Sequence, residues 1–205
     1  VSFVLGPFSP ISHEIFKQKL DVFYHYKDHY VLDTSLPFTE TISKYRRRDA
    51  RRAIKNGISV EIVTSPNINL NEWVDLYDNL IQRHHITGIR AFSRESFSKQ
   101  ISIPNTYFFK ALHQGAVVGG NLYYIQDNVA YGHLLALSPK GYQLGASHAI
   151  KWVAIQHFTN KVRWINFGGS TTKNLENKDG LDMFKLGWSS TTKPSYFCGK
   201  ILQPG

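Results

Sequence analysis

The sequence of 205 residues contains a single cysteine, Cys198, and a single methionine. One cysteine cannot form an intramolecular disulfide or a site built only from cysteines, and this usage suits a reducing, cytoplasmic location. No stretch approaches the run of about 20 apolar residues that crosses a membrane. The apolar segment Val1–Ile11 is short and lacks the positively charged start of a secretory signal. These absences predict a soluble, cytoplasmic protein without a membrane span.

Acidic residues are also scarce, because 15 Asp and Glu stand against 24 Lys and Arg and give a net charge of +9. Such a balance favours anionic partners, among them nucleic acids and phosphate-bearing ligands. Much of the charge lies in Lys44–Lys55, where helical spacing would gather five cations on one face: Lys44, Arg48, Arg51, Arg52 and Lys55. Arg48 and Arg52 are therefore candidates to bind phosphates of an acceptor or of tRNA. A merely solvated helix face is the alternative.

Hydrophobic residues make up 42% of the chain, which is enough for a sizeable core. Hydrophobic spacing and capping residues predict helices over 9–26, 39–57, 69–84, 94–101 and 146–158. Alternation predicts strands over 59–63, 107–112, 116–125, 129–137, 164–167 and 194–202, with a loop over 139–145. This order predicts an α+β domain on one mixed sheet, with residues 1–38 as an extension that packs on a core domain of residues 39–205.

The segment Lys140–Gly145 follows a predicted strand and opens a predicted helix. Backbone N–H groups at such a helix start can bind an anion such as a pyrophosphate, and Gly141 and Gly145 would let the backbone approach it. An ordinary tight turn has the same composition, so this pattern alone leaves both interpretations open.

Four segments together resemble a known superfamily. They are the Lys140-x-x-Gln143-x-Gly145 loop, the basic run Ser43-Lys-Tyr-Arg-Arg-Arg-Asp-Ala-Arg-Arg-Ala53, the strand end Trp164-Ile-Asn-Phe-Gly-Gly169, and Gly180-Leu-Asp-Met-Phe-Lys-Leu-Gly-Trp188. In this order, over about residues 39–202, they resemble the GNAT acyltransferases and specifically their FemAB-like branch. The chain departs from the superfamily at Gln143, where the loop usually has glycine, and it shows only one of the two half-domains of FemAB proteins.

The resemblance implies a GNAT-like mixed, largely antiparallel sheet flanked by helices. It also implies direct transfer of an acyl group from acyl-CoA, acetyl-CoA or an acyl carrier protein to an amine, such as a small molecule or an amino sugar, without a metal. The side chain of Gln143 would crowd a pyrophosphate. Two alternatives therefore stay open: an aminoacyl-tRNA-dependent transferase of FemAB type, and a non-catalytic basic binding module.

By this resemblance, Lys185 of the Phe-Lys pair stabilises charge at the reacting centre, with Phe184, Gly168 and Gly169 at the substrate. The residues expected to hold the donor are Leu135, Ala136, Leu137, Lys140, Gly141, Gln143, Leu144, Gly145 and Ala146.

The residues themselves suggest how protons move. His133 has a suitable intrinsic pKa to accept a proton, although a histidine in a strand is more often a core residue. Tyr142 is a candidate to protonate the leaving group. His25 and His29 are spaced four apart, but no third ligand accompanies them and a zinc site is not expected.

Overall fold

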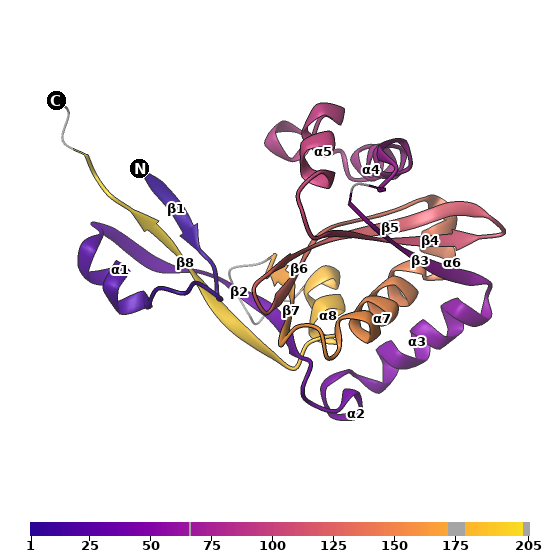
Figure 1. Cartoon of the computed structure of the whole chain (residues 1–205), viewed down its shortest axis with the longest axis horizontal. Helices are drawn as coiled ribbons and strands as arrows, with labels where there is room; N and C mark the ends of the chain where they lie inside the picture. The colour runs from indigo at the N-terminus through magenta and orange to yellow at the C-terminus, as the bar shows by residue number, and fades with distance from the viewer. Residues whose placement is uncertain (66, 172–178, 203–205) are drawn as a thin grey trace.

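One eight-stranded sheet runs through the molecule, in the order β1-β8-β2-β7-β6-β5-β4-β3 (Figure 1). The computed structural model describes residues 1–65, 67–171 and 179–202. The strands are β1 (Ser2–Leu5), β2 (Val22–Asp33), β3 (Ile58–Thr64), β4 (Thr106–His113), β5 (Ala116–Gln126), β6 (Val129–Leu137), β7 (Trp164–Gly169) and β8 (Thr191–Gly199). Every strand pair is antiparallel except β6 with β7, which is parallel. The prediction of a mixed, largely antiparallel sheet is therefore confirmed.

Helices lie on both faces of this sheet. They are α1 (His13–Lys19), α2 (Phe38–Thr41), α3 (Lys44–Lys55), α4 (Leu70–His84), α5 (Arg94–Ile101), α6 (Pro139–Leu144), α7 (Ala146–Phe158) and α8 (Gly180–Leu186), with a 3₁₀ turn at Gly88–Arg90. In Figure 1, α4 and α5 cover one face of the β3–β6 half of the sheet, and α3 and α7 cover the other. No helix in the described part of the chain has the length and apolar character of a membrane span.

The strands of this half form because successive side chains alternate between two cores. Phe109 and Tyr123 join the core that α3 and α7 cover, whereas their neighbours Phe108 and Leu122 join the core beneath α4 and α5. Sharp turns connect the strands, and Gly115 takes a positive φ of 80° in the turn between β4 and β5. The alternation in the sequence thus predicted β4, β5 and β6 correctly.

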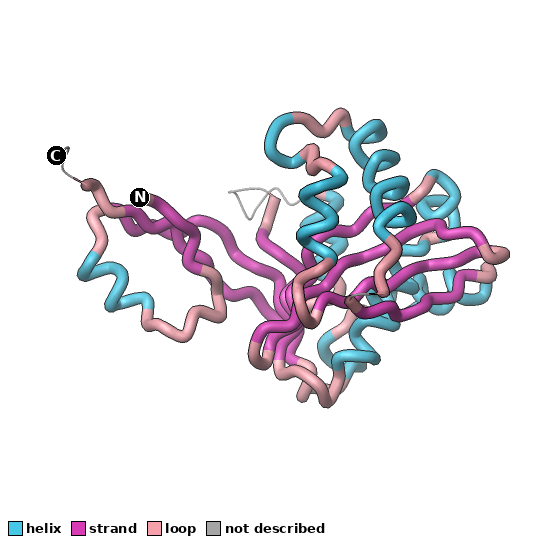
Figure 2. Tube along the Cα trace, turned by 45° about the horizontal axis from the view of Figure 1, so that its top comes forward, coloured by secondary structure: helices cyan, strands magenta, loops and turns pink. Residues whose placement is uncertain are grey.

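The N-terminal region contributes two strands rather than a long helix, so the predicted helix over 9–26 is wrong beyond α1. Strand β2 begins at Val22 and pairs with β8 from Val22–Gly199 to Val31–Thr191. The aromatic residues that crowd this segment favour a strand, because they stack across it: Phe23 on Tyr196 and Tyr24 on Phe197, with ring centroids 4.8 and 5.3 Å apart. Strands β1, β2 and β8 together form an arm that projects from the body of the molecule (Figure 2).

The predicted helix over 39–57 is two helices. Ile42 interrupts it in an extended conformation and is buried in the core, and the side chain of Ser43, rather than that of Thr39, caps α3 by accepting a hydrogen bond from Arg46 N. The break lies at this cap, because an N-cap residue has a non-helical backbone conformation.

Two further boundaries differ from the prediction. The last strand spans Thr191–Gly199 rather than residues 194–202, and α8 forms in a stretch for which the sequence predicted no element. Asp179 caps α8 by accepting hydrogen bonds from Leu181 N and Asp182 N, as an aspartate at a helix start commonly does.

Candidate active site

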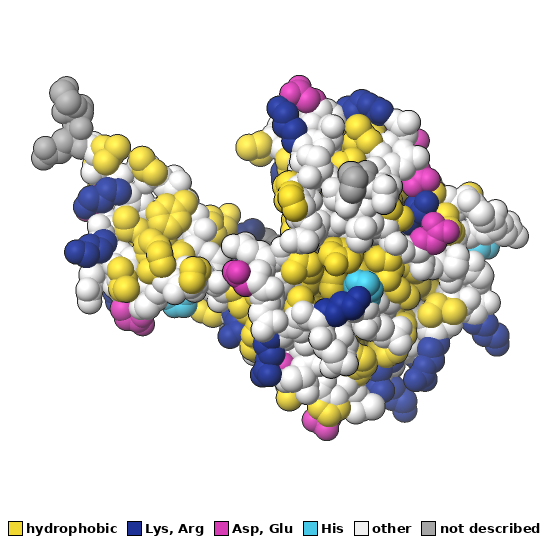
Figure 3. All heavy atoms as spheres, in the orientation of Figure 1, with side chains coloured by type: hydrophobic (Ala, Val, Ile, Leu, Met, Phe, Trp, Pro, Cys, Tyr) yellow, Lys and Arg dark blue, Asp and Glu magenta, His cyan; other side chains and the backbone are white. Residues whose placement is uncertain are grey.

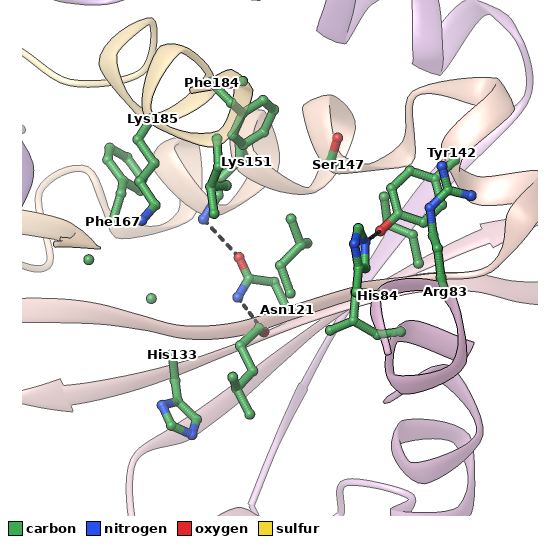
Figure 4. A pocket seen from close by; sticks show the side chains of 18 of the residues that line it. Arg83, His84, Asn121, His133, Tyr142, Ser147, Lys151, Phe167, Phe184 and Lys185 are labelled. Atoms are coloured by element: carbon green, nitrogen blue, oxygen red, sulfur yellow. Dashed lines mark hydrogen bonds between the residues drawn. The ribbon is translucent and has the colours of Figure 1, made fainter. Parts of the chain in front are cut away.

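A cavity of about 590 Å³ lies beside the point where β6 and β7 separate, and α4, α6, α7 and α8 complete its walls. In Figure 3, hydrophobic side chains gather below α4 and α5, beside histidine and cationic side chains. Most of the lining is apolar. The polar lining residues are Arg83, His84, Asn121, His133, Tyr142, Ser147, Lys151 and Lys185 (Figure 4). Within the described residues, the lining includes no aspartate or glutamate.

The separation of the two strands follows from their pairing. Strand β6 pairs with β7 only from Val129–Trp164 to Tyr131–Asn166. On its other edge β7 pairs with β2 from Asp33–Trp164 to His29–Gly169, and the Nδ1 atom of His29 lies 3.1 Å from Asn166 Oδ1. Described residues of β6 beyond Tyr131 have no partner in β7. Backbone N–H groups on this side of β6 therefore face the cavity rather than a neighbouring strand.

The Phe-Lys pair of α8 lies at the edge of this opening. Lys185 Nζ donates a 2.7 Å hydrogen bond to the carbonyl oxygen of Gly169, so the predicted grouping of Lys185 with the strand end is present. Phe184 and Gly168 also line the cavity, and Gly168 has a φ of +92° that favours glycine. Burial lowers the pKa of Lys185, and the nearby Lys27 cation lowers it further, while Asp182 opposes this shift.

Lys151 is a cavity residue that the sequence analysis did not identify. It lies on α7, is only 6% exposed, and donates hydrogen bonds to Asn121 Oδ1 at 2.9 Å and to the Tyr123 hydroxyl at 3.0 Å. Burial lowers its pKa to about 7, and repulsion from Lys185 adds to this effect. The available signal was a lone cation within an otherwise apolar helix surface, since the buried residues of α7 around it are Ala146, Ala149, Ile150, Ala154, Ile155 and Phe158.

His133 and Tyr142 both line the cavity, but on different walls (Figure 4). His133 projects from β6, where its Nε2 lies 3.0 Å from Gln100 Oε1, and desolvation lowers its pKa. Tyr142 projects from α6, and the guanidinium carbon of Arg83 lies 4.2 Å from the centroid of the Tyr142 ring. Burial raises the pKa of Tyr142. His84 Nε2 lies 3.5 Å from the Tyr142 hydroxyl.

The predicted loop over 139–145 is instead the short helix α6, which changes the outlook for a pyrophosphate site. The side chain of Ser138 accepts a hydrogen bond from Gly141 N, and a Cβ on Gly141 would lie 2.0 Å from Val118 O. Glycine is thus needed here for α6 to pack against β5. Of the residues expected to hold the donor, only Leu135 and Leu137 line the cavity; those that do not are Ala136, Lys140, Gly141, Gln143, Leu144, Gly145 and Ala146.

The basic residues of α3 lie outside the cavity. The predicted face is present, because Lys44, Arg48, Arg51, Arg52 and Lys55 are all exposed. Arg52 pairs with Asp49 at 3.2 Å, whereas Arg46 turns inward, donates to Met183 O and stacks on the Phe184 ring. Helix α3 therefore exposes these cations to solvent, while Arg46 packs against α8.

The described residues contain no group of three or more His, Cys, Asp and Glu side chains that could hold a metal ion. His25 and His29, which the sequence spacing singled out, lie on β2. His25 contacts Asp28, and His29 contacts Asn166. Cys198 is buried in β8, as expected of a core residue.

Comparison with protein-family models finds no match, and comparison with curated proteins finds no significant match. Solved structures do match. The C-terminal domain of a protein assigned as a lysylphosphatidylglycerol synthetase from Agrobacterium fabrum superposes with a TM-score of 0.72 at 15% identity, covering 96% of this chain and 66% of that one. L-PGS from Bacillus licheniformis gives 0.70 at 14% identity, covering 92% and 65%. FemX gives 0.69 at 12% identity, covering 89% and 67%.

The chain has a FemAB-like GNAT fold. At these identities the likeness establishes the fold, and the chain spans about two thirds of the length of these solved structures. Lys185 and the part of β6 without a β7 partner border the same cavity.

Proposed function

We propose that this chain is an aminoacyl transferase that moves an aminoacyl group from aminoacyl-tRNA to an amine acceptor. The observation that carries the proposal is the cavity between β6 and β7, where the Lys185 side chain and unpaired β6 backbone border one apolar space. Such a site can bind an activated carbonyl while excluding much of the water. No covalent enzyme intermediate is required.

The form of α6 favours tRNA over acyl-CoA as the donor. A CoA pyrophosphate would need free backbone N–H groups in the segment 139–145, but the amide of Gly141 is bonded to Ser138. Lys140 is exposed and lies outside the cavity lining. Two of the matching structures carry the name of a lysylphosphatidylglycerol synthetase, which describes an aminoacyl transfer. The exposed cations of α3 supply a surface that can bind the phosphates of tRNA.

The chemistry assigns one role to each group. The acceptor amine attacks the ester carbonyl, and its oxygen becomes negatively charged as the tetrahedral intermediate forms. Unpaired N–H groups of β6 and the ammonium of Lys185 stabilise this oxygen, because both hold their dipole or charge in place before the reaction. The intermediate then breaks its bond to the ribose oxygen, which leaves with the tRNA.

Two protons must move during this sequence. His133, whose pKa is lowered by desolvation, is neutral at pH 7 and can accept the proton that the attacking amine loses. Tyr142 keeps its proton at pH 7, since burial raises its pKa, and can donate that proton to the departing oxygen. The Arg83 guanidinium stacked on its ring then stabilises the phenolate until it is reprotonated.

The test compares donors directly. The chain is incubated with labelled aminoacyl-tRNA or with labelled acetyl-CoA, each with a panel of amines, and transfer of label is measured. We expect transfer from aminoacyl-tRNA only. Transfer from acetyl-CoA alone would replace the proposal with an acyl-CoA-dependent transferase. Transfer from neither donor, together with salt-sensitive tRNA binding, would replace it with a basic binding module.

The tRNA surface has its own test. Replacing the exposed pair Arg48 and Arg52 by glutamine should weaken tRNA binding and reduce the dependence of log K on log salt by about 1 to 2. The matched control replaces Arg94 and Lys99 on α5, which are exposed cations on the opposite face of the sheet. An equal loss in the control would show that binding follows net charge rather than α3.

A further inference from the structure

Lys151 has no role in the transfer chemistry above, although it is the cavity cation with the least solvent exposure, 6%. Removing an ammonium group from water is costly unless an opposite charge compensates it. Within the described residues no carboxylate pairs with Lys151, whose hydrogen-bond partners are the neutral groups of Asn121 and Tyr123. The fold therefore maintains a buried cation that lacks a counter-ion of its own.

The surroundings of Lys151 hold its amine in a fixed orientation. Asn121 Nδ2 donates to the carbonyl oxygens of Leu122 and Leu134, at 3.1 and 2.7 Å, so its Oδ1 is left to accept from Lys151. Burial keeps Tyr123 a neutral phenol by raising its pKa. The bonds to Asn121 and Tyr123 use two of the three hydrogen-bond positions of Nζ and leave one for a ligand in the cavity. Figure 4 shows the bond to Asn121.

The rest of the lining has the same electrostatic character. Arg83, Lys151 and Lys185 all border the cavity, and none of its described lining residues is acidic. These cations would stabilise a carboxylate that entered the cavity. Ser147 lies one helical turn before Lys151, also lines the cavity, and offers a second hydrogen-bond donor.

We propose that Lys151 binds a carboxylate carried by a substrate, with Asn121 and Tyr123 orienting its ammonium group. The proposal rests on the proposed function only for which molecule carries that carboxylate. The carboxylate belongs either to an acidic aminoacyl group on the donor or to the acceptor amine. Lys151 is then a specificity-determining residue, and Lys185 remains the residue at the reacting carbonyl.

The site also couples binding to protonation. The ionisable groups around Lys151 are Lys185 on α8 and Tyr123 on β5, and the cavity adds His133 on β6, Tyr142 on α6, and Arg83 and His84 on α4. With a pKa of about 7, Lys151 is mostly neutral at pH 8 in the free protein. A bound carboxylate raises this pKa, so binding at pH 8 takes up a proton and weakens as the pH rises.

The first experiment measures binding by titration calorimetry at pH 8. The probes are matched pairs that differ only in a carboxylate or its amide: the α-methyl esters of N-acetylglutamate and N-acetylglutamine, and β-alanine with β-alaninamide. We expect the carboxylate of at least one pair to bind about 10- to 100-fold more tightly than its amide. Titrations in two buffers of different ionisation enthalpy should show uptake of up to one proton. Equal affinity within both pairs, or binding without proton uptake, would overturn the proposal.

The variant Lys151→Met removes the amine and keeps the length of the side chain, and Lys99→Met on the exposed face of α5 is its matched control. Lys151→Met should abolish the preference for the carboxylate probe, and Lys99→Met should keep it. Circular dichroism checks that both variants fold. The wild-type titrations test the proposal even if Lys151→Met fails to fold. A preference that survives in folded Lys151→Met would assign it to another cation.

Transfer assays identify the carrier of the carboxylate. If it is the donor, glutamyl- or aspartyl-tRNA is used in preference to glutaminyl- or asparaginyl-tRNA, and Lys151→Met removes this preference. If it is the acceptor, donors are used alike and β-alanine is preferred to β-alaninamide. Transfer without any charge preference leaves the proposed function standing and rejects the subsite. Carboxylate binding without transfer from any donor supports the subsite and rejects the proposed function.

Discussion

The two parts of β6 differ in what lies beside them. Its first three residues pair with β7 and close the sheet, whereas described residues after Tyr131 border a cavity. The same strand therefore holds the sheet together at one end and offers unpaired backbone at the other. Strand β7 stays paired with β2 on its other edge from Trp164 to Gly169, but its pairing with β6 ends at Asn166. The site thus arises where one of the two edges of β7 loses its partner strand.

The two lysines beside the opening show the same contrast in their environment. Lys185 sits on α8 at the cavity edge and bonds a backbone carbonyl, while Lys151 sits on α7 and bonds two side chains that are themselves buried. One lies beside the proposed reacting carbonyl, and the other lies deeper, where a substrate group would be recognised. The following predictions test this division.

The largest effect is expected for Lys185→Ala. Loss of a cation beside the developing oxyanion should lower kcat by about 100-fold or more, as removal of a single oxyanion-stabilising donor does in other enzymes. The melting temperature should stay nearly unchanged, because Lys185 bonds only one carbonyl at the cavity edge. Transfer assays and thermal denaturation measure the two quantities, with Lys99→Ala as the control. Unchanged transfer would remove Lys185 from the mechanism.

Two glycines of the sheet should also respond differently to an added methyl group. On β5, which pairs with both β4 and β6, a Cβ on Gly120 would lie 2.2 Å from the Phe108 ring, so Gly120→Ala should destabilise the fold by about 1–3 kcal/mol. At the cavity, Gly168→Ala meets Lys185 Nζ only at 3.7 Å but strains a φ of +92° at a cost of about 1 kcal/mol.

Denaturant unfolding and transfer kinetics separate these two glycines. Gly120→Ala should reduce stability while leaving the rate per folded molecule unchanged, and Gly168→Ala should reduce kcat more than stability. Equal effects of both changes on both quantities would contradict the division of the sheet into a structural and a functional part.

Lys151 should make stability depend on pH. Its pKa is about 7 in the folded chain and close to 10.4 when unfolded, so the unfolded state binds more protons between these values and stability rises with pH. From pH 7 to pH 9 the gain should be about 2 kcal/mol in the wild type relative to Lys151→Met. Urea unfolding at both pH values measures it, and a flat difference would show that Lys151 is not buried as a cation.

A smaller effect is expected on the acid side from His148, on α7 near Phe184 and Trp188. Burial lowers its pKa to about 4, and the Arg46 cation adds to this shift, although Asp49 opposes it. The folded state therefore binds fewer protons than the unfolded state between pH 4 and 6.5, and stability falls as the pH drops through this range. His148→Leu should lower the midpoint of acid unfolding, as followed by circular dichroism. His25→Leu, at an exposed position of β2, serves as the control.

Much of the fold could be predicted from the sequence because its signals are local. Alternation in β4–β6 and helical spacing in α4, α5 and α7 gave elements close to those observed, since one face of each element must be buried. The failures lie where a distant partner decides. The aromatic residues of β2 needed β8 to stack on, and Gly141 needed β5 before α6 could pack.

The candidate site divides in the same way. Lys185 could be predicted because its motif is contiguous, and His133 and Tyr142 were predicted from residue type and position; all three line the cavity. Lys151 could not, because its meaning depends on Asn121 and Tyr123, which precede it by 30 and 28 residues. In sequence it is one lysine among apolar residues of a helix.

The sequence by itself determined which segments are helices and strands over most of the chain, and where positive charge is concentrated on α3. Only the tertiary structure decided how far β7 stays paired with β6, and so where a cavity opens and which cations face it. The physical reason is that hydrophobic periodicity acts between near neighbours, whereas strand partners and the burial of a charge are settled between residues far apart in the chain.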